Sequence, residues 1–380
     1  MTADTRREFV KKSLLTAGMI PPAFQAAGQG PEDLGNFRSD VTSPPYPWTN
    51  LNFHNEPRNF RFAILPDLTG RERPGVFVEA VKKLNMLQPE FVISIGDVIE
   101  GHSNDKAKLN SDWNLFLEHV APLEMPFFYL AGNHDYWYGT VQGPDGRPIV
   151  YDMREVYEQH AGPPYYHFLY HNVLFLILQN TVSERTIDST SKTFDNKGSH
   201  AVASDFYAKQ KQYVTEVLTQ NQDVRWTFVF IHYPTFFNWP LADHITSLLG
   251  DRPYITFGGN SHEYVYYNRG GREYINVATV GGMSRMRGVR HGELDHFLWV
   301  TMRDDGPRLA NLTLDGILPK TLRTESSAKR TDELLRESPL STPILFQARG
   351  HFQSLTTKIR LVNSSERELK IRGSFQPHDT

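Results

Sequence analysis

From residue 60 onward, short apolar runs alternate with stretches that carry apolar residues at helical spacing. A run of four or five apolar residues is typical of a buried strand, whereas a spacing of three and four residues is typical of a helix. Strands that alternate with helices along a chain pair in parallel through right-handed crossovers. This part of the sequence therefore predicts an α/β fold. The expected strands are 62–65, 91–95 and 127–131, and the expected helices are 74–87 and 113–120.

The second half of the chain continues this pattern and then changes character. A long helix is expected over 204–221, among strands at 165–169, 173–178, 226–231 and 254–257. After residue 262 the helical spacing stops, and apolar alternation with turn residues indicates antiparallel strands. These expected strands are 263–267, 273–280, 297–302 and 308–314.

The composition is that of an ordinary globular protein and excludes several classes. Hydrophobic residues make up 39% of the 380 residues, which is enough for a sizeable core. The formal net charge is −3 and long basic runs are missing, so nothing in the sequence indicates nucleic-acid binding. Because the chain has no cysteine, disulfides, thiolate metal sites and a cysteine nucleophile are all excluded.

The first thirty residues resemble a twin-arginine export signal of bacteria. Arg6-Arg7 precede an apolar stretch over 13–20, and small residues follow at Ala26-Ala27. The alternative is a disordered arm that happens to contain two arginines. The apolar stretch is too short for a membrane-spanning helix of about 20 residues, and no other segment is long and apolar enough. We therefore expect recognition by the twin-arginine export machinery, a periplasmic or extracellular location and no transmembrane helix.

The remaining chain divides into four predicted parts. Residues 31–59 are rich in Pro, Asn and Ser and are expected to form an extended lead-in to the main domain, 60–316. Residues 317–341 are charged and rich in Ser and Thr, as in a linker or a surface helix. Residues 342–380 form a short β-rich segment, in which strand-like runs at 357–361 and 368–371 flank a turn.

Polar residues that can bind metals follow five of the expected strands. Ligands bind at the carboxyl ends of parallel strands, so these residues are expected to share one crevice. A single Asp after a strand is usually a helix cap or a turn residue. Five strand ends in one chain that are all followed by possible metal ligands are not expected by chance. Carboxylates, amide oxygens and imidazoles together suit Mn, Fe or Zn. The residues are Asp67, Asp97, Asn133-His134-Asp135, His232 and Asn260-Ser261-His262.

These residues, in this order, resemble the signature of the calcineurin-like metallophosphoesterases. Its most specific element is Gly132-Asn133-His134-Asp135, and Gly96-Asp97, His232-Tyr233-Pro234 and Gly259-Asn260-Ser261-His262 match the other elements. The resemblance implies a four-layer αββα sandwich with mixed sheets and a centre of two divalent metal ions. It further implies that Asp97 bridges the two ions, with Asp67 and His262 on one ion and Asn133 and His232 on the other. His134, paired with Asp135, would be the catalytic residue that assists the leaving group.

Two positions depart from the family pattern. Thr69 stands where the first motif has a histidine, and Asn260 stands where the last motif has another. Each metal therefore loses one imidazole, although the Asn260 side-chain oxygen remains a possible ligand. Loss of ligands weakens metal binding, so one of the two ions is expected to be weakly bound or missing.

The resemblance thus predicts a hydrolase that cleaves a phosphate mono- or diester by attack of a metal-bound hydroxide. The alternative is a degenerate member of the family that binds an anionic ligand or a protein partner without turnover, which Thr69 and Asn260 favour. A basic loop over 281–288 contains Arg285 and Arg287, which either contact an anionic substrate or lie on an ordinary surface loop. Several other histidines, His102 among them, have no recognisable partner in the sequence.

Overall fold

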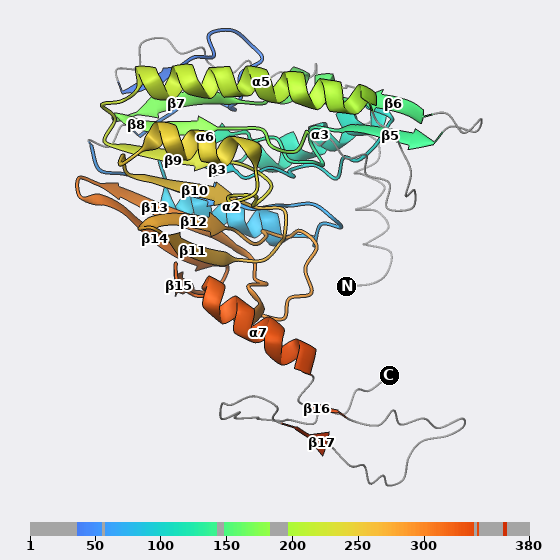
Figure 1. Cartoon of the computed structure of the whole chain (residues 1–380), viewed down its shortest axis with the longest axis vertical. Helices are drawn as coiled ribbons and strands as arrows, with labels where there is room; N and C mark the ends of the chain where they lie inside the picture. The colour runs from blue at the N-terminus through green and yellow to red at the C-terminus, as the bar shows by residue number, and fades with distance from the viewer. Residues whose placement is uncertain are drawn as a thin grey trace, which may run out of the picture.

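Two mixed β-sheets pack face to face, and helices cover their outer faces (Figure 1). The computed structural model describes residues 36–54, 58–142, 148–182, 197–337, 340–341 and 360–362. Helices, sheet, sheet and helices follow one another as four layers, and the predicted αββα sandwich is therefore confirmed.

The first sheet has six strands in the order β15-β14-β13-β2-β3-β4. Its three N-terminal strands are parallel, as the alternation of strands and helices predicts. The other three strands form an antiparallel meander that joins the edge of β2. The strands are β2 (Phe60–Leu65), β3 (Phe91–Ser94), β4 (Phe127–Phe128), β13 (His296–Arg303), β14 (Gly306–Thr313) and β15 (Ile317–Pro319).

The second sheet has seven strands in the order β1-β7-β8-β9-β10-β12-β11. The strands β8, β9, β10 and β12 are parallel to one another, and the pairs at the two edges are antiparallel. The strands are β1 (Phe37–Ser39), β7 (Tyr166–Tyr170), β8 (Val173–Ile177), β9 (Trp226–Phe230), β10 (Tyr254–Gly258), β11 (Val265–Arg269) and β12 (Arg272–Asn276).

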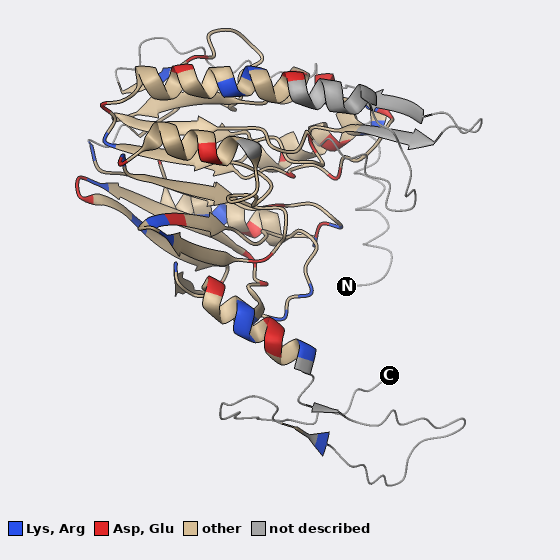
Figure 2. Ribbon diagram, viewed as in Figure 1, with Lys and Arg blue, Asp and Glu red and all other residues tan. Residues whose placement is uncertain are grey.

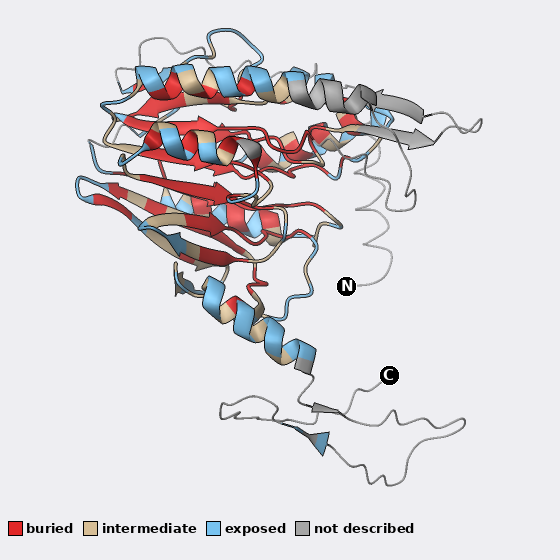
Figure 3. Ribbon diagram, viewed as in Figure 1, coloured by how far each residue is buried: buried red, intermediate tan, exposed pale blue. Residues whose placement is uncertain are grey.

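The main helices bury their apolar faces against the outer faces of the two sheets. α2 (Val76–Leu87), α3 (Lys106–Val120) and α4 (Arg154–Ala161) pack on the first sheet. α5 (Lys197–Gln220) and α6 (Pro240–Leu249) pack on the second. The described sheet strands are mostly buried, whereas the outer sides of the helices are exposed (Figure 3).

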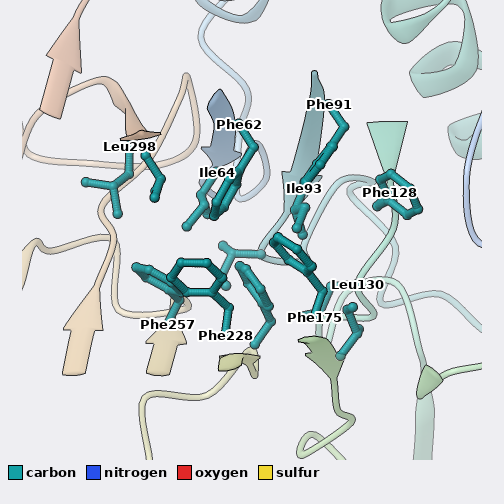
Figure 4. Close-up of a cluster of buried hydrophobic side chains, with 14 of the residues drawn as sticks. Phe62, Ile64, Phe91, Ile93, Phe128, Leu130, Phe175, Phe228, Phe257 and Leu298 are labelled. Carbon is teal, nitrogen blue, oxygen red and sulfur yellow. The ribbon is translucent and has the colours of Figure 1, made fainter. Parts of the chain in front are cut away.

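Aromatic side chains fill the space between the two sheets. Along β2 the side chains alternate, so Phe62 and Ile64 point to the other sheet while Ala63 and Leu65 face the helices. The Phe62 ring lies 5.2 Å from the rings of both Phe175 and Phe228 in edge-to-face contacts (Figure 4). This packing fixes how the ends of the two sheets lie relative to each other.

Some elements differ from the sequence prediction. α3 begins at Lys106 rather than near residue 113, because the Asp105 carboxylate caps it by accepting bonds from two backbone N–H groups. The third strand, β4, is two residues long. The hairpin of β5 (Tyr138–Gln142) and β6 (Pro148–Asp152) and the helices α4 and α6 were not predicted. Both helices are short, although α6 does carry apolar residues at helical spacing, at Leu241, Ile245 and Leu248.

The described part of the lead-in belongs to the core. β1 pairs with β7, and Phe37 and Trp48 are each only 2% exposed. The 317–341 stretch contains β15 and a highly charged surface helix, α7 (Glu325–Glu337), as Figure 2 shows.

The two ends of the chain are described only in part or not at all. β16 (Leu340–Ser341) pairs with β17 (Arg360–Leu361). The rest of the expected C-terminal β-rich segment and the export signal over 1–30 lie outside the described residues. Within the described part of the chain, no helix has the length and hydropathy that crossing a bilayer requires.

Candidate metal centre

Five strand ends bring the predicted ligands together, and they come from both sheets rather than one. Asp67, Asp97 and Asn133 follow β2, β3 and β4 of the first sheet, while His232 and His262 follow β9 and β10 of the second. One donor atom each from Asp67, Asp97 and His232 lies within 4.8 Å of the others. All three side chains are 2% exposed or less, so the cluster lies at the floor of the site.

Backbone carbonyls hold three imidazoles in the same orientation. The Nδ1 atoms of His134, His232 and His262 lie 2.7, 2.8 and 2.5 Å from the carbonyl oxygens of Glu100, Ile95 and Met283, respectively. A carbonyl oxygen only accepts hydrogen bonds, so each Nδ1 carries the proton and donates it. Each Nε2 is therefore left to face the carboxylates, as in histidines that bind metals.

The ring nitrogens and oxygens converge on a small volume. His232 Nε2 lies 3.2 Å from Asp97 Oδ2 and 3.0 Å from Asn133 Oδ1. His262 Nε2 lies 3.3 Å from Asp67 Oδ2, and His134 Nε2 lies 3.9 Å from Asp97 Oδ2. When the imidazoles are neutral, all of these atoms present lone pairs to one another. Such an arrangement requires a proton or a cation between them.

The pKa values of the cluster show the same strong coupling. Burial alone would lower the pKa of His232, but the charge of Asp97 and its hydrogen bond raise that pKa to about 10. Burial alone would raise the pKa of Asp97, but His232 lowers it to about 2. The pKa of Asp67 is raised mainly by burial. A pair that holds a proton this firmly is also suited to hold a divalent cation in its place.

Two glycines allow the strand ends to approach the carboxylates closely. A Cβ atom at Gly132 would lie 2.1 Å from Asp97 Oδ1, and one at Gly259 would lie 2.6 Å from Asp67 Oδ1. Both glycines belong to the motifs that resemble the family signature. Their structural role is thus to leave space for the two carboxylates.

The loops of the site hold several residues in a strained backbone conformation. Asp97, His102, Asn260 and His262 have φ angles of 54°, 44°, 65° and 54°, in the left-handed region that non-glycine residues rarely adopt. Strain of this kind persists where the surrounding structure enforces it, and it concentrates at functional sites.

The structure corrects the expected pairing of His134 with Asp135. The Asp135 carboxylate accepts hydrogen bonds from the backbone N–H groups of Asp97, Val98, Ile99 and Gly132, at 2.6 to 3.1 Å. The backbone carbonyl of Glu100, rather than Asp135, orients the imidazole of His134. Burial and then the charge of Asp97 raise the pKa of Asp135 to about 7, while the hydrogen bonds from the backbone lower it. Asp135 thus fastens the loop after β3 to the loop after β4.

The two positions that depart from the family pattern both lie at the site. Thr69 is 2% exposed, and its hydroxyl has no hydrogen-bond partner among the described residues. The backbone N–H of Asn260 donates to Asp67 Oδ2 at 2.7 Å. The other carboxylate oxygen, Asp67 Oδ1, is buried and likewise has no partner among the described residues. A buried carboxylate oxygen left open beside imidazole nitrogens fits a metal ligand, so the residues present suit a metal ion.

The two arginines of the 281–288 loop differ in their surroundings. Arg287 forms a salt bridge with Glu293 at 2.5 Å, and that contact holds the loop together. Arg285 is exposed and forms no ion pair with any described residue. The loop itself borders the site, because the carbonyl of Met283 binds His262 and its N–H donates to the Thr69 carbonyl.

Two residues near the ligands carry no recognisable signal in the sequence. The Asn180 side-chain oxygen accepts hydrogen bonds from the backbone N–H groups of His232 and Tyr233, and so holds the end of β9. The His102 ring stacks on the His134 ring, with centroids 3.8 Å apart. Both contacts join segments far apart in the sequence, so spacing along the chain does not reveal them.

A four-layer α/β sandwich with carboxylates, an amide and imidazoles at its strand ends is the architecture of a metallophosphoesterase. The model of the calcineurin-like phosphoesterase family matches residues 60–264, which is more than half of the chain. The protein therefore belongs to the calcineurin-like phosphoesterase family. No curated protein matches the sequence.

Solved structures agree at the level of the fold. A dimetal phosphatase from Danio rerio is 12% identical with a TM-score of 0.50, and the match covers 68% of this chain and 98% of that one. GAP50, the anchor in the inner membrane complex of Plasmodium, is 17% identical with a TM-score of 0.43, covering 68% of this chain and 85% of that one. The likeness to the dimetal phosphatase supports the fold.

Proposed function

We propose that this protein is a metal-dependent hydrolase of phosphate mono- or diesters. The observation that carries the proposal is the buried group of Asp67, Asp97 and His232, whose donor atoms lie within 4.8 Å of one another. Two divalent ions bound at such a site lower the pKa of a shared water molecule and hold phosphate oxygens in place. Mn, Fe and Zn all match this set of donors.

The side chains divide this work among themselves. Asp97 would serve both ions, with Asp67 and His262 as ligands of one and Asn133 and His232 as ligands of the other. Support for this division is that His262 Nε2 lies 3.3 Å from Asp67 Oδ2 and His232 Nε2 lies 3.0 Å from Asn133 Oδ1. The Asn260 side-chain oxygen is a further candidate ligand. His134 is only partly buried, with 20% of its side chain exposed, so its Nε2 is available to a bound substrate. With a second proton on Nε2, the His134 imidazolium would donate to the departing oxygen and stabilise its negative charge.

The basic loop contributes to substrate binding through one of its two arginines. Support for this role is that Arg285 is exposed and lies two residues after Met283, whose backbone contacts both Thr69 and His262. Arg287 is neutralised by Glu293 and supports the loop instead. An Arg285→Ala variant should raise the KM for an anionic substrate more than it lowers kcat.

The experiment that tests the proposal combines metal analysis with turnover. Metal-free protein is loaded with Mn²⁺, Fe²⁺ or Zn²⁺, and the metal content per chain and hydrolysis of an aryl phosphate monoester and diester are measured. We expect metal uptake and turnover that a chelator abolishes and added metal restores. Tight metal uptake with no turnover of either ester would contradict the proposal.

The second candidate is a family member that binds an anionic ligand or a protein partner without turnover. It is favoured by Thr69, whose buried hydroxyl stands in place of an imidazole, and by Asn260. A Thr69→His/Asn260→His variant that gains much activity would indicate a site that has lost its catalytic power. A loss of activity would indicate a site adapted to its present ligands.

We also propose that the protein is exported through the twin-arginine machinery to the periplasm or beyond. The support is the sequence alone: Arg6-Arg7, then a short apolar stretch and small residues. Replacing both arginines by lysine should leave the protein inside the cell in a bacterial host with this pathway. Unchanged export of the Arg6→Lys/Arg7→Lys variant would overturn this proposal and leave the proposed hydrolase function untouched.

A further inference from the structure

His102 lies in the loop between β3 and α3, directly against two residues of the candidate centre. Its Nε2 lies 3.0 Å from the side-chain Nδ2 of Asn133. Its ring stacks on that of His134 at 3.8 Å, with an angle of 21° between the planes, and also contacts Trp137 at 4.7 Å. His102 itself lies outside the metal-binding motifs.

The hydrogen bond to Asn133 has a defined direction. The amide NH₂ group can only donate, so His102 Nε2 must be the unprotonated nitrogen that accepts. The other end of the same amide, Asn133 Oδ1, then lies 3.0 Å from His232 Nε2. An asparagine side chain can present either end to a neighbour, but only its oxygen can bind a metal ion.

The loop around His102 is shaped to hold this contact. His102 has a φ angle of 44°, which is unfavourable for a residue with a Cβ atom. A Cβ atom at the preceding Gly101 would lie 1.8 Å from the backbone oxygen of His134. The chain thus passes as close to the 133–134 segment as a glycine allows, and it does so in a strained conformation.

We propose that His102 is a positioning residue that captures the NH₂ end of Asn133 and thereby presents the carbonyl oxygen of Asn133 to the metal centre. The same imidazole supports the ring of the proposed catalytic residue, His134, by stacking on it. The inference rests on the proposed metal-dependent function of this site. In this proposal His102 does not bind the metal itself. It acts through its Nε2 atom, which accepts a hydrogen bond from the end of the Asn133 amide that points away from the metal centre.

Two substitutions of His102 separate the acceptor from the ring. His102→Phe keeps a flat ring against His134 but removes the accepting nitrogen, whereas His102→Gln keeps an acceptor oxygen and removes the ring. The readout is Mn²⁺ affinity by equilibrium dialysis, without any phosphate ester present. We expect His102→Phe to weaken Mn²⁺ binding by about 10-fold or more and His102→Gln to recover part of that loss.

The chain offers a control at a second histidine–asparagine pair, between α3 and α4. His160 Nε2 donates to Asn110 Oδ1 at 2.7 Å, and the His160 ring stacks on Trp113. A His160→Phe variant should change thermal stability but leave Mn²⁺ affinity unchanged. If His160→Phe and His102→Phe weaken Mn²⁺ binding equally, or if folded His102→Phe binds Mn²⁺ like the wild type, the inference is wrong.

A change in Asn133 tests the orientation argument directly. In an Asn133→Asp variant both ends of the side chain are oxygens, so no partner is needed to select one. His102→Phe should therefore alter Mn²⁺ affinity by less than about twofold in that background, against about 10-fold in the wild type. An equal loss in both backgrounds would show that His102 acts by packing and would overturn the inference. Wild-type protein that binds Mn²⁺ but hydrolyses no phosphate ester would overturn the proposed hydrolase function alone.

Discussion

Asp97 joins several parts of the candidate centre through both its backbone and its carboxylate. Its backbone N–H donates to Asp135 at 2.6 Å, and its Oδ1 accepts a hydrogen bond from the backbone N–H of His134 at 2.8 Å. Its Oδ2 is therefore the oxygen that faces the imidazoles of His232 and His134. The negative charge of Asp97 would offset the repulsion between two cations bound next to each other.

Removing that charge should abolish metal binding. Asp97→Asn keeps the shape of the side chain but offers a neutral amide, so we expect Mn²⁺ uptake to fall below detection in metal analysis of dialysed protein. Asp105→Asn is the control, because Asp105 is an exposed helix cap with no role at the site. Full Mn²⁺ content in Asp97→Asn would contradict the role of Asp97 as the central ligand.

His134 should affect the rate of reaction rather than metal binding. Its Nε2 is 3.9 Å from Asp97 Oδ2, farther than that of His232, and its side chain is partly exposed. We expect His134→Ala to retain Mn²⁺ and to lose at least about 100-fold in kcat for an aryl phosphate. Unchanged turnover would rule out the proposed role at the leaving group, and lost Mn²⁺ would indicate a ligand instead.

At the scale of the elements, the site depends on how the loop after β3 is fastened to the loop after β4. Asp135 receives four backbone N–H groups from these two loops, so the conformation of residues 96–99 depends on a residue almost forty positions later. This contact connects the geometry of the Asp97 carboxylate to the short strand β4.

An Asp135→Asn variant should loosen both loops. The amide has only one accepting oxygen, and its NH₂ group would face backbone donors, so at least one buried N–H loses its partner. We expect a loss of about 2–5 kcal/mol in the free energy of unfolding, measured with denaturant, together with weaker Mn²⁺ binding. Asp112→Asn is the control, because Asp112 accepts one backbone bond at the same loop, from Gly101, and otherwise pairs with Lys108 on the surface of α3. Wild-type Mn²⁺ affinity in Asp135→Asn would show that the loops keep their shape without the four bonds.

The order of the main strands and helices could be predicted, because the spacing of apolar residues and the polar residues at strand ends are local properties of the sequence. Asp67, Asp97 and Asn133 follow strands that short apolar runs indicate, and the structure brings their donor atoms together with those of His232. The contacts of Asp135, Asn180 and His102 could not be predicted in this way. Each joins a side chain to the backbone or amide of a loop elsewhere in the sequence, and nothing in the local pattern identifies that partner.

At the scale of the whole molecule, the site exists because two sheets end at the same place. β2, β3 and β4 supply one half of the ligands, and β9 and β10 supply the other. The aromatic core between the sheets, including Phe62 and Phe228, sets the distance between the halves. The sequence pattern predicts each strand but not the relative placement of the sheets, and only the resemblance to a known family predicts the sandwich.

The stability of this sandwich should depend on pH through a histidine away from the metal centre. His296 begins β13, is fully buried, and accepts a hydrogen bond on Nε2 from the backbone N–H of Ala278 at 3.0 Å. Burial lowers the pKa of His296 to about 3, from 6.5 in an exposed histidine. Between these two values the unfolded chain binds a proton that the folded protein does not, so stability falls as the pH is lowered.

The magnitude follows from the width of that window. Each pH unit below 6.5 lowers the free energy of unfolding by about 1.4 kcal/mol through His296. At about pH 5 the free energy of unfolding should therefore be about 2 kcal/mol lower than at pH 7 because of this residue. Denaturant unfolding of metal-free protein from pH 5 to 8 measures the effect, and His296→Gln provides the comparison. Gln offers an acceptor oxygen but does not titrate, and the other groups of the protein contribute equally to both proteins. The wild type should therefore lose more stability on acidification than His296→Gln, and identical pH dependence would show that His296 is not held neutral by the fold.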